Sequence, residues 1–363
     1  MRPSPGSTHG GRGCPARIRL PPKGPEVRVG AVDCGTNSIR LLVADIDPAT
    51  RTVRDVVREL RVVRLGAGVE RTGRLDPARI AAALAAAREY ADRCRAQDVE
   101  AVRFVATSAS RDAANAGDFV AGVAAAFRDF GIGPEVITGA DEARLSFDGA
   151  TGDVRAAGIP GPHLVVDIGG GSTEFVRGAA SIESAVSLDI GCVRLTERHL
   201  LADPSPSDNP AGTPASPQGT PAGAMTDAMV EGLAAAWSDA ATAVTRAADV
   251  VSFAGLGALV GLAGTVTTVT AHARRLAAYD PKQIHLAILT PAATIAACTE
   301  LTRMDRTERA ALPYMHPGRV DVIAAGALIW RAVVEAVVAA SGPVPVVTSE
   351  HDILDGIALS LVP

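Results

Sequence analysis

A short motif, Asp-x-Gly-x-x-Ser, occurs twice in this chain, each time between two apolar runs. The first copy extends from Asp33 to Ser38 and the second from Asp167 to Ser172. The apolar runs on either side are of the buried-strand type, so each copy predicts a strand, a tight turn and a second strand. Because the pattern is duplicated, we expect two related halves whose turns face each other across a cleft and hold one phosphate chain from both sides.

The second turn has the chemistry of a phosphate and metal site. Gly169 to Gly171 carry no Cβ, so their backbone N–H groups can approach a ligand and form a concave row of donors. The hydroxyls of Ser172 and Thr173 add donors at the same place. Asp167 offers an acceptor that an anion cannot use but that Mg²⁺ or its water shell can. A lone glycine-rich turn is also typical of surface hairpins, and the duplication is what favours phosphate binding.

The charge composition excludes two classes of function. The formal net charge is −5 over 363 residues, so a generally basic surface for nucleic acid is not expected. Lys23 and Lys282 are the only lysines, and no GxxxxGK[ST] sequence is present. The chain is therefore not an ordinary P-loop ATPase, and phosphate recognition must depend on arginines and backbone N–H groups.

Cysteine usage and hydropathy favour a cytoplasmic protein without a membrane partner. The five cysteines are scattered and lack C-x-x-C spacing, which suggests neither a zinc site nor a disulfide framework. Residues 251–271 reach the length of a membrane span, but their glycines and threonines favour a strand, a turn and a helix start. The apolar run 320–340 is broken by Arg331 and Glu335. We expect no transmembrane segment.

Two segments have the composition of disorder. Residues 1–26 alternate proline, glycine and arginine, which predicts a disordered leader, and residues 203–224 hold prolines among small polar residues, which predicts a disordered surface insertion. Between them, the first half reads as three strands, a helix, a strand, a helix and a strand. The ranges expected are 27–34, 39–46, 53–65, a helix capped at Asp76, 101–106, 113–130 and 135–138.

A helix rich in acids is expected to follow the strand 135–138. Asp141 at its start is typical of helix capping. Glu142 is different if its side chain points into the cleft, because repulsion from bound phosphate would raise its pKa and let it take a proton from water. Later, residues 259–268 again read as a strand, a small-residue turn and a helix, which offers N–H groups of Gly264 and Thr265 to a nucleotide or another phosphate.

The helix expected at 319–340 is apolar and rich in alanine. We favour a core position for it, on the second sheet, and leave a homodimer surface open. The pair His351-Asp352 reads as a helix cap rather than as metal ligands, and the other histidines show no ligand spacing.

Five motifs together resemble the exopolyphosphatase and guanosine pentaphosphate phosphatase family, Ppx/GppA. They are Asp33-x-Gly-Thr-Asn-Ser, Thr107-Ser-Ala-Ser-Arg111, Gly139-x-Asp-Glu-Ala-Arg144, Asp167-Ile-Gly-Gly-Gly-Ser-Thr-Glu174 and Gly261-Leu-Ala-Gly-Thr265. The resemblance implies an α/β fold of two RNase H-like domains, as in actin-like ATPases and sugar kinases, about a cleft. The domains expected are 27–148 and 149–349, with the closing helix 350–361 packing back on the first. It also implies a short form without the family's additional C-terminal HD-type domain.

The resemblance implies roles by position. Glu142 matches the catalytic base, Arg111 a phosphate-binding arginine and Glu174 a second acid of the site, while Asp33 and Asp167 match the acids near Mg²⁺, for which Mn²⁺ is a substitute. The phosphate-binding positions are Gly35, Thr36, Asn37, Ser38, Gly169, Gly170, Gly171, Ser172, Thr173, Gly264 and Thr265. Two residues depart from the family pattern: Asp141 replaces a glutamate and Cys34 an aliphatic residue.

The implied activity is hydrolysis of a terminal phosphoanhydride of inorganic polyphosphate, with release of orthophosphate. The alternative is hydrolysis of guanosine pentaphosphate, a nucleotide of the stringent response, because the motifs are common to exopolyphosphatases and guanosine pentaphosphate phosphatases. Two further functions could use the same cleft. One is a non-enzymatic nucleotide or alarmone sensor, and the other is a kinase that acts on a carboxylate or a sugar.

Overall fold

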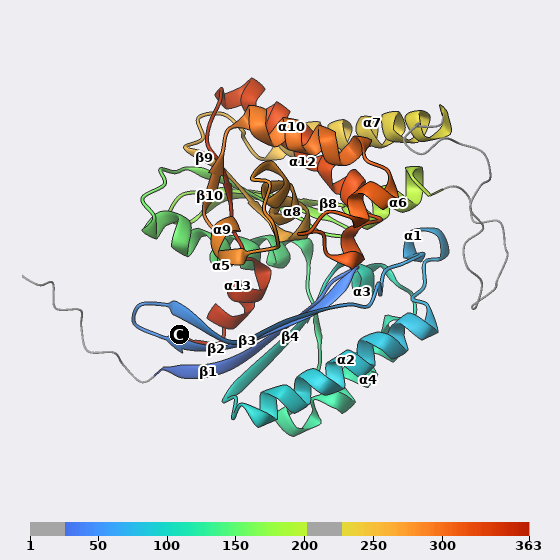
Figure 1. Ribbon diagram of the computed structural model, residues 1–363. Coiled ribbons are helices and arrows are strands. Elements are labelled where there is room, and N and C mark those ends of the chain that lie inside the picture. Colours follow the sequence, from blue (N-terminus) through green and yellow to red (C-terminus); the bar gives the residue numbers. More distant parts are fainter. Residues whose placement is uncertain (1–25, 202–226, 363) are drawn as a thin grey trace, which may run out of the picture.

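The computed structural model describes residues 26–201 and 227–362 and contains two β-sheets with helices on both sides (Figure 1). Apart from residue 26, the predicted leader 1–26 and the predicted insertion 203–224 lie outside the described residues.

The first sheet has five strands in the order β3-β2-β1-β4-β5. Its strands are β1 (Val27–Cys34), β2 (Ser38–Asp47), β3 (Thr52–Val62), β4 (Ala101–Ala106) and β5 (Glu135–Val136). β1 pairs antiparallel with β2 and parallel with β4. The first turn thus joins the first two strands of the β1-β2-β3 meander, as the sequence predicts.

The second sheet repeats this arrangement. Its six strands follow the order β10-β11-β9-β6-β7-β8, and they are β6 (His163–Ile168), β7 (Thr173–Gly178), β8 (Ile182–Leu188), β9 (Ala258–Leu262), β10 (Ala287–Leu289) and β11 (Val346–Thr348). β6 pairs antiparallel with β7 and parallel with β9, just as β1 pairs with β2 and β4. The predicted fold class, with two related α/β halves, is confirmed.

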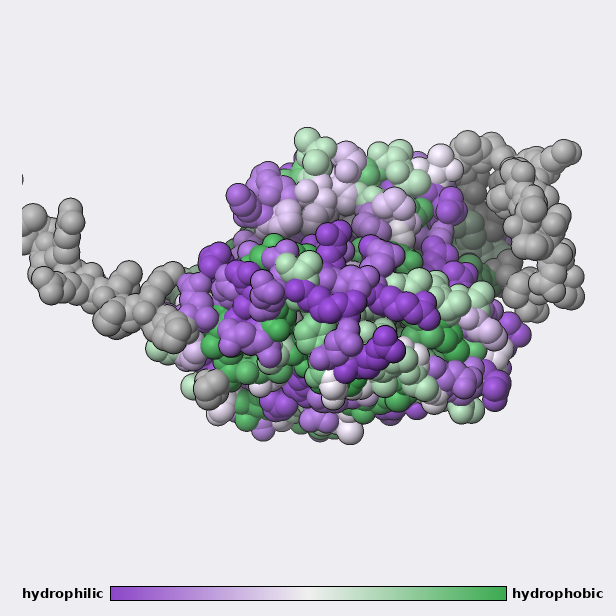
Figure 2. All heavy atoms as spheres, turned by 90° about the horizontal axis from the view of Figure 1, so that it is seen from below, coloured by the Kyte–Doolittle hydropathy of each residue, from purple (hydrophilic) through white to green (hydrophobic). Residues whose placement is uncertain are grey.

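Helices form three layers around the sheets. The helices are α1 (Val69–Thr72), α2 (Pro77–Ala96), α3 (Ser108–Asp112), α4 (Ala116–Ala126), α5 (Gly139–Ala156), α6 (Cys192–His199), α7 (Asp227–Val250), α8 (Ala263–Ala273), α9 (Pro281–Ile284), α10 (Pro291–Arg303), α11 (Arg306–Ala310), α12 (Ile323–Ser341) and α13 (Ile353–Leu359). α2 and α4 cover the outer face of the first sheet, and α7, α8, α10 and α12 cover that of the second. Seen from below, the surface mixes hydrophilic with smaller hydrophobic regions (Figure 2).

α5 and α13 lie between the sheets. α13 packs on β1, β2 and β4, while α5 packs on β6, β7 and β8, and the two helices contact each other. Their crossing is close because glycines face it. A Cβ on Gly149 would lie 2.0 Å from the carbonyl oxygen of Asp352, and one on Gly356 would lie 2.0 Å from that of Leu145. The closing segment of the chain is thereby held against the first sheet.

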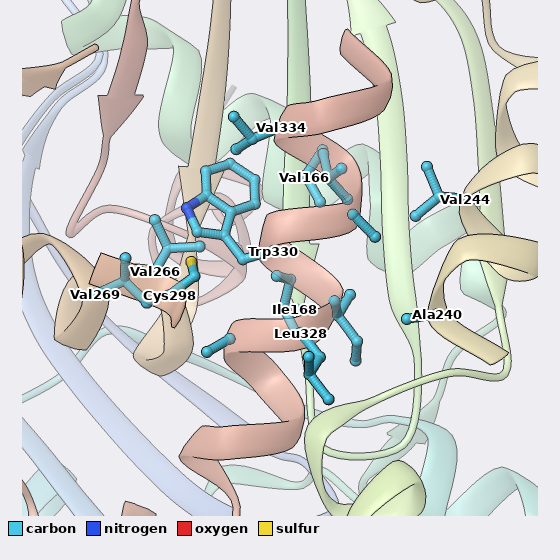
Figure 3. Close-up of a cluster of buried hydrophobic side chains, with 14 of the residues drawn as sticks. Val166, Ile168, Ala240, Val244, Val266, Val269, Cys298, Leu328, Trp330 and Val334 are labelled. Carbon is cyan, nitrogen blue, oxygen red and sulfur yellow. The ribbon is translucent and has the colours of Figure 1, made fainter. Parts of the chain in front are cut away.

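α12 is the only helix of the described residues that is long and apolar enough to cross a membrane, and 67% of its most apolar window is buried within the molecule. Trp330 of α12 is fully buried and lies in one cluster with Val266 and Val269 of α8 and Cys298 of α10 (Figure 3). On its other side α12 packs against α7. This packing accounts for the apolar composition of the helix, which the sequence led us to expect in the core.

Several predicted boundaries differ from the structure: the strands expected at 53–65 and 135–138 are Thr52–Val62 and Glu135–Val136. The helix expected at 319–340 begins at Ile323, because Pro317–Arg319 form a separate 3₁₀ turn. The helix expected at 113–130 is α4, which ends where Phe127 enters the core beside Phe104, and a 3₁₀ turn follows. After β4, Ser108–Asp112 form the short helix α3, which was not predicted from the sequence.

Candidate active site

A cavity opens between the two sheets, and both glycine turns line it. Twelve of the predicted site residues lie on its wall: Asp33, Gly35, Thr36, Asn37, Ser38, Glu142, Asp167, Gly169, Gly170, Ser172, Gly264 and Thr265. Four predicted residues do not line the cavity, namely Arg111, Gly171, Thr173 and Glu174. The segments 33–38 and 167–173 therefore face a common space, although they lie far apart in the sequence.

The two turns have the same backbone geometry. The N–H of Gly35 donates to the carbonyl of Ser38 over 2.9 Å, and the N–H of Gly169 donates to the carbonyl of Ser172 over 3.0 Å. The turns also touch across the cavity, since a Cβ on Gly170 would lie 2.9 Å from Cβ of Thr36. Glycine is required here because the opposite turn occupies the space that a side chain would need.

A partly buried arginine of the cavity wall pairs with two aspartates. Arg40 Nη2 lies 2.7 Å from Asp33 Oδ2, and its Nη1 pairs with Asp352, the N-cap of α13. Burial raises the pKa of Asp33 although Arg40 acts in the opposite direction. We assigned no role to Arg40. Its position directly opposite Asp33 in the β1–β2 hairpin is the signal that could have found it.

Asp167 and Glu174 are buried neighbours on adjacent strands. They lie opposite each other in the β6–β7 pair, and Asp167 accepts a hydrogen bond of 2.7 Å from the Ser146 hydroxyl. Burial and the charge of Asp352 raise the pKa of Asp167 to about 6. Glu174 accepts from Ser187 over 2.7 Å, and burial, followed by the charges of Glu142 and Asp167, holds its pKa well above its usual range.

Glu142 lies at the cavity wall, and one of its carboxylate oxygens has no hydrogen-bond partner among the described residues. It stands in the first turn of α5, whose N-cap Thr138 accepts from the N–H of Asp141. The side chain of Glu142 is buried at the cavity wall, and its Oε2 has no hydrogen-bond partner. Burial, then the charges of Asp33 and Asp167, raise its pKa to about 8. In its ionised form, a carboxylate with this pKa and no hydrogen-bond partner at Oε2 is suited to accept a proton.

Arg111 lies beside Glu142 at the end of α3. Its Nη1 donates to the carbonyl of Ile137 over 3.1 Å and lies 3.5 Å from Glu142 Oε2, which is an ion-pair distance. Thr173 has a structural partner, because its hydroxyl donates to the carbonyl of Ile190 over 2.5 Å. Gly171 packs against Ser108 and Thr36, where a Cβ would lie 2.6 Å from the Ser108 hydroxyl.

The third turn, between β9 and α8, brings a further arginine that the sequence reading missed. Ala263 has a positive φ of 63°, a strained conformation for a residue with a Cβ. Next to it, Arg319 lies over Gly264, where a Cβ would come 2.4 Å from its Nε, and donates to the Thr268 hydroxyl over 3.1 Å. Arg319 lines the cavity. No local pattern marked it, because it enters from a 3₁₀ turn distant in the sequence.

The donor set fits a divalent cation. Asp33, Asp167 and Glu142 line one cavity, with Glu174 behind them, and repulsion from a neighbouring carboxylate, which for Asp33 is Asp352, contributes to the raised pKa of each. A hard cation with oxygen ligands would offset this repulsion. The free oxygen of Glu142 and the carboxylates of Asp33 and Asp167 are therefore consistent with the predicted Mg²⁺ position.

Comparison with known proteins agrees with the fold and the motifs. The model of the Ppx/GppA phosphatase family matches residues 42–245 and 224–361. The chain is 44% identical to "Exopolyphosphatase 2" of Mycobacterium tuberculosis over 338 residues, which are 92% of this chain and 98% of that protein.

Solved structures extend this similarity. An exopolyphosphatase-like protein is 37% identical with a TM-score of 0.79, and the match covers 93% of this chain and 98% of that one. A Ppx/GppA family member from Aquifex aeolicus is 27% identical with a TM-score of 0.69, again covering 93% and 98%.

Proposed function

The chain belongs to the Ppx/GppA phosphatase family, and we propose that it is an exopolyphosphatase, a phosphoanhydride hydrolase that releases orthophosphate from the end of inorganic polyphosphate. The observation that carries the proposal is the cavity in which both glycine turns face Glu142. The relative named an exopolyphosphatase, which is 44% identical over most of both chains, supports the choice of polyphosphate over guanosine pentaphosphate.

The two turns bind and orient the terminal phosphates. Backbone N–H groups and the hydroxyls of Thr36 and Ser172 on opposite walls offer donors to the oxygens of one phosphate chain. The donors are held by the paired hairpins before substrate arrives, so they can stabilise the charge of the transferring phosphoryl group without reorganisation.

Glu142 accepts the proton of the attacking water. The carboxyl stands in the first turn of α5, with no hydrogen-bond partner at Oε2 and with Arg111 Nη1 at an ion-pair distance of 3.5 Å from that oxygen. It must be ionised to act, and positive charge in the cavity favours the ionised form. Glu174 lies behind Glu142 and Asp167, so we propose that it contributes charge and position to the site rather than contact with phosphate.

We propose Mg²⁺ as the cofactor, with Mn²⁺ as a substitute, held by Asp33 and Asp167. When bound, it neutralises negative charge on the phosphate oxygens. Removal of divalent ions by a chelator is expected to abolish phosphate release, and added Mg²⁺ is expected to restore it. Retained activity after thorough chelation would exclude this assignment.

A single substrate comparison tests the activity. Purified protein with Mg²⁺ receives polyphosphate, guanosine pentaphosphate or ATP, and free orthophosphate is measured. We expect the highest kcat/KM on polyphosphate. A higher value on guanosine pentaphosphate would assign the alternative substrate, and binding without release from any of the three would assign a nucleotide or alarmone sensor.

Arg111→Ala is expected to raise KM for polyphosphate about tenfold or more with a smaller change in kcat, because a charged contact to phosphate contributes about 1.5–3 kcal/mol. Arg144→Ala is the matched control, since Arg144 belongs to the same region but is half exposed and, within the described residues, forms an ion pair with Asp148 over 3.6 Å. Steady-state kinetics on both variants checks the expectation. Equal KM values for the two would remove Arg111 from the phosphate site.

We also propose a cytoplasmic location and keep a homodimer as a proposal. Cell fractionation tests the first, and light scattering of the purified protein tests the second.

A further inference from the structure

Two histidines and an aspartate meet outside the active-site cavity. Asp153 comes from α5, His285 follows α9, and His351 directly precedes α13. His351 Nδ1 lies 2.6 Å and His285 Nε2 lies 3.3 Å from the same oxygen, Oδ2 of Asp153. The two imidazole rings are 4.7 Å apart between centroids. We propose that Asp153, His285 and His351 form a binding site for a borderline divalent transition-metal ion, with Zn²⁺ as the main candidate.

The donor chemistry favours such an ion over Mg²⁺. Imidazole nitrogens together with a carboxylate oxygen are the set that Zn²⁺ prefers, whereas Mg²⁺ prefers oxygen ligands alone. Three protein ligands leave a fourth tetrahedral position for water. All three side chains are partly exposed, at 43% for Asp153, 23% for His285 and 29% for His351, so an ion can reach them from solvent.

The distances are close to those of a tetrahedral site. With metal–ligand bonds of about 2.0–2.1 Å, ligand atoms lie about 3.3–3.4 Å apart along a tetrahedral edge. The separation of His285 Nε2 from Asp153 Oδ2, 3.3 Å, already has this value. The separation of His351 Nδ1 from the same oxygen, 2.6 Å, must widen by less than an ångström. Rotation of side chains that are partly in solvent can supply this change.

The surroundings of His351 support metal binding through Nδ1. Its other nitrogen, Nε2, faces Oδ1 of Asp355, which is buried in α13, at 4.0 Å, which is longer than a hydrogen bond. A ligating histidine commonly directs its second ring nitrogen at a carboxylate, which fixes the tautomer and the orientation of the ring. Asp355 is itself held by Arg58 over 2.5 Å, so the carboxylate is positioned independently of the metal.

The surroundings of His285 require one rearrangement. Its Nδ1 accepts a hydrogen bond of 3.2 Å from the backbone N–H of Glu350. Metal binding through Nε2 places the ring proton on Nδ1, so this hydrogen bond must break and the ring must turn. Glu350 lines a second cavity next to the active site, where its carboxylate accepts from Tyr279. Occupation of the metal site is therefore expected to displace a residue of that neighbouring wall.

Cobalt and zinc binding to the purified full-length chain tests the proposal. Metal-free protein is titrated with Co²⁺ and followed by visible absorption, then with Zn²⁺ by calorimetry, both in excess Mg²⁺ to occupy the catalytic carboxylates. We expect one additional tightly bound ion per chain, and d–d absorption typical of nitrogen and oxygen ligands. Because loss of an outer hydrogen-bond partner alone costs about 10–100-fold in affinity, His285→Ala, His351→Ala and Asp153→Asn should each weaken Zn²⁺ binding by about 100-fold or more.

His199→Ala is the matched control, because His199 Nε2 also lies 2.8 Å from a carboxylate, that of Asp239, but in the described residues no second imidazole joins the pair. It should leave Zn²⁺ affinity unchanged. Circular dichroism verifies that each variant is folded, and both histidines lie outside the helices, whereas Asp153 lies in α5. Unchanged affinity in the folded His285→Ala variant, or loss of the ion on Asp167→Asn instead, would overturn the proposal. Neither result bears on polyphosphate hydrolysis, which is assayed separately.

Discussion

Replacement of Glu142 by glutamine is expected to lower kcat for polyphosphate by about 100-fold or more while the substrate still binds. Glutamine keeps the shape of the side chain and removes the oxygen that accepts a proton from water. Oε2 of Glu142 is buried and has no hydrogen-bond partner in the described residues, so the contact that changes is the ion pair with Arg111 Nη1 over 3.5 Å. Phosphate release gives kcat, and calorimetry with polyphosphate gives the dissociation constant.

Asp141→Asn is the control for this variant, because Asp141 stands next to Glu142 but serves the start of α5 through Thr138. Its turnover should stay near that of the unchanged protein. Near-normal turnover of Glu142→Gln would refute the assignment of the base, and loss of binding in that variant would show that Glu142 holds the substrate instead.

The same variant should also be more stable at alkaline pH. In the folded chain the pKa of Glu142 is raised from 4.5 to about 8, chiefly by burial. Between these values the folded state keeps a proton that the unfolded state releases, so the free energy of unfolding falls as pH rises through this window. Glutamine does not titrate. With divalent ions removed, we expect Glu142→Gln to exceed the unchanged protein in stability by on the order of 2–4 kcal/mol at pH 8 and by little at pH 4.5.

Denaturant unfolding at the two pH values measures this difference. Equal stability of the two proteins at pH 8 would show that the carboxyl is already ionised in the folded chain. A stability gain together with lost turnover would show that the fold maintains Glu142 at a cost, as is common for groups that carry chemistry.

Gly149→Ala is expected to destabilise the chain severely, by more than about 4 kcal/mol, or to prevent folding. The new Cβ would lie 2.0 Å from the carbonyl of Asp352 and 2.8 Å from the N–H of Gly356, both backbone atoms that cannot rotate away. α5 and α13 must then separate. Because Asp352 pairs with Arg40 of the cavity wall, the active site is expected to be disturbed with the helix crossing.

Gly152→Ala in the same helix is the matched control, since a Cβ there meets no atom within 4 Å. It should stabilise the chain by up to about 1 kcal/mol, because alanine favours the helix over glycine. Denaturant midpoints of the two variants check both expectations. A folded Gly149→Ala variant with an unchanged midpoint would mean that the crossing is not close-packed.

The local sequence pattern was sufficient to predict those parts of the fold that depend on residues close together in the chain. The duplicated Asp-x-Gly-x-x-Ser motif identified both hairpins, because a buried strand, a glycine turn and a second strand are specified within about fifteen residues. Boundaries were less accurate. α12 begins at Ile323 rather than at 319, because a 3₁₀ turn precedes it and brings Arg319 to the cavity. The hydropathy of the sequence does not distinguish this turn from the helix that follows.

The sequence by itself therefore determined the two related halves, the motifs of the site and, by resemblance, the family. Only the tertiary structure decided which side chains meet: Arg40 between Asp33 and Asp352, Arg319 over Gly264, and His285 with His351 at Asp153. The sequence predicted a raised pKa for Glu142 from repulsion by bound phosphate, and only the tertiary structure supplied the causes that act without a ligand, namely burial and the charges of Asp33 and Asp167. The physical reason is that hydropathy and turn patterns act between neighbours along the chain, whereas desolvation, charge repulsion and ligand geometry act through space.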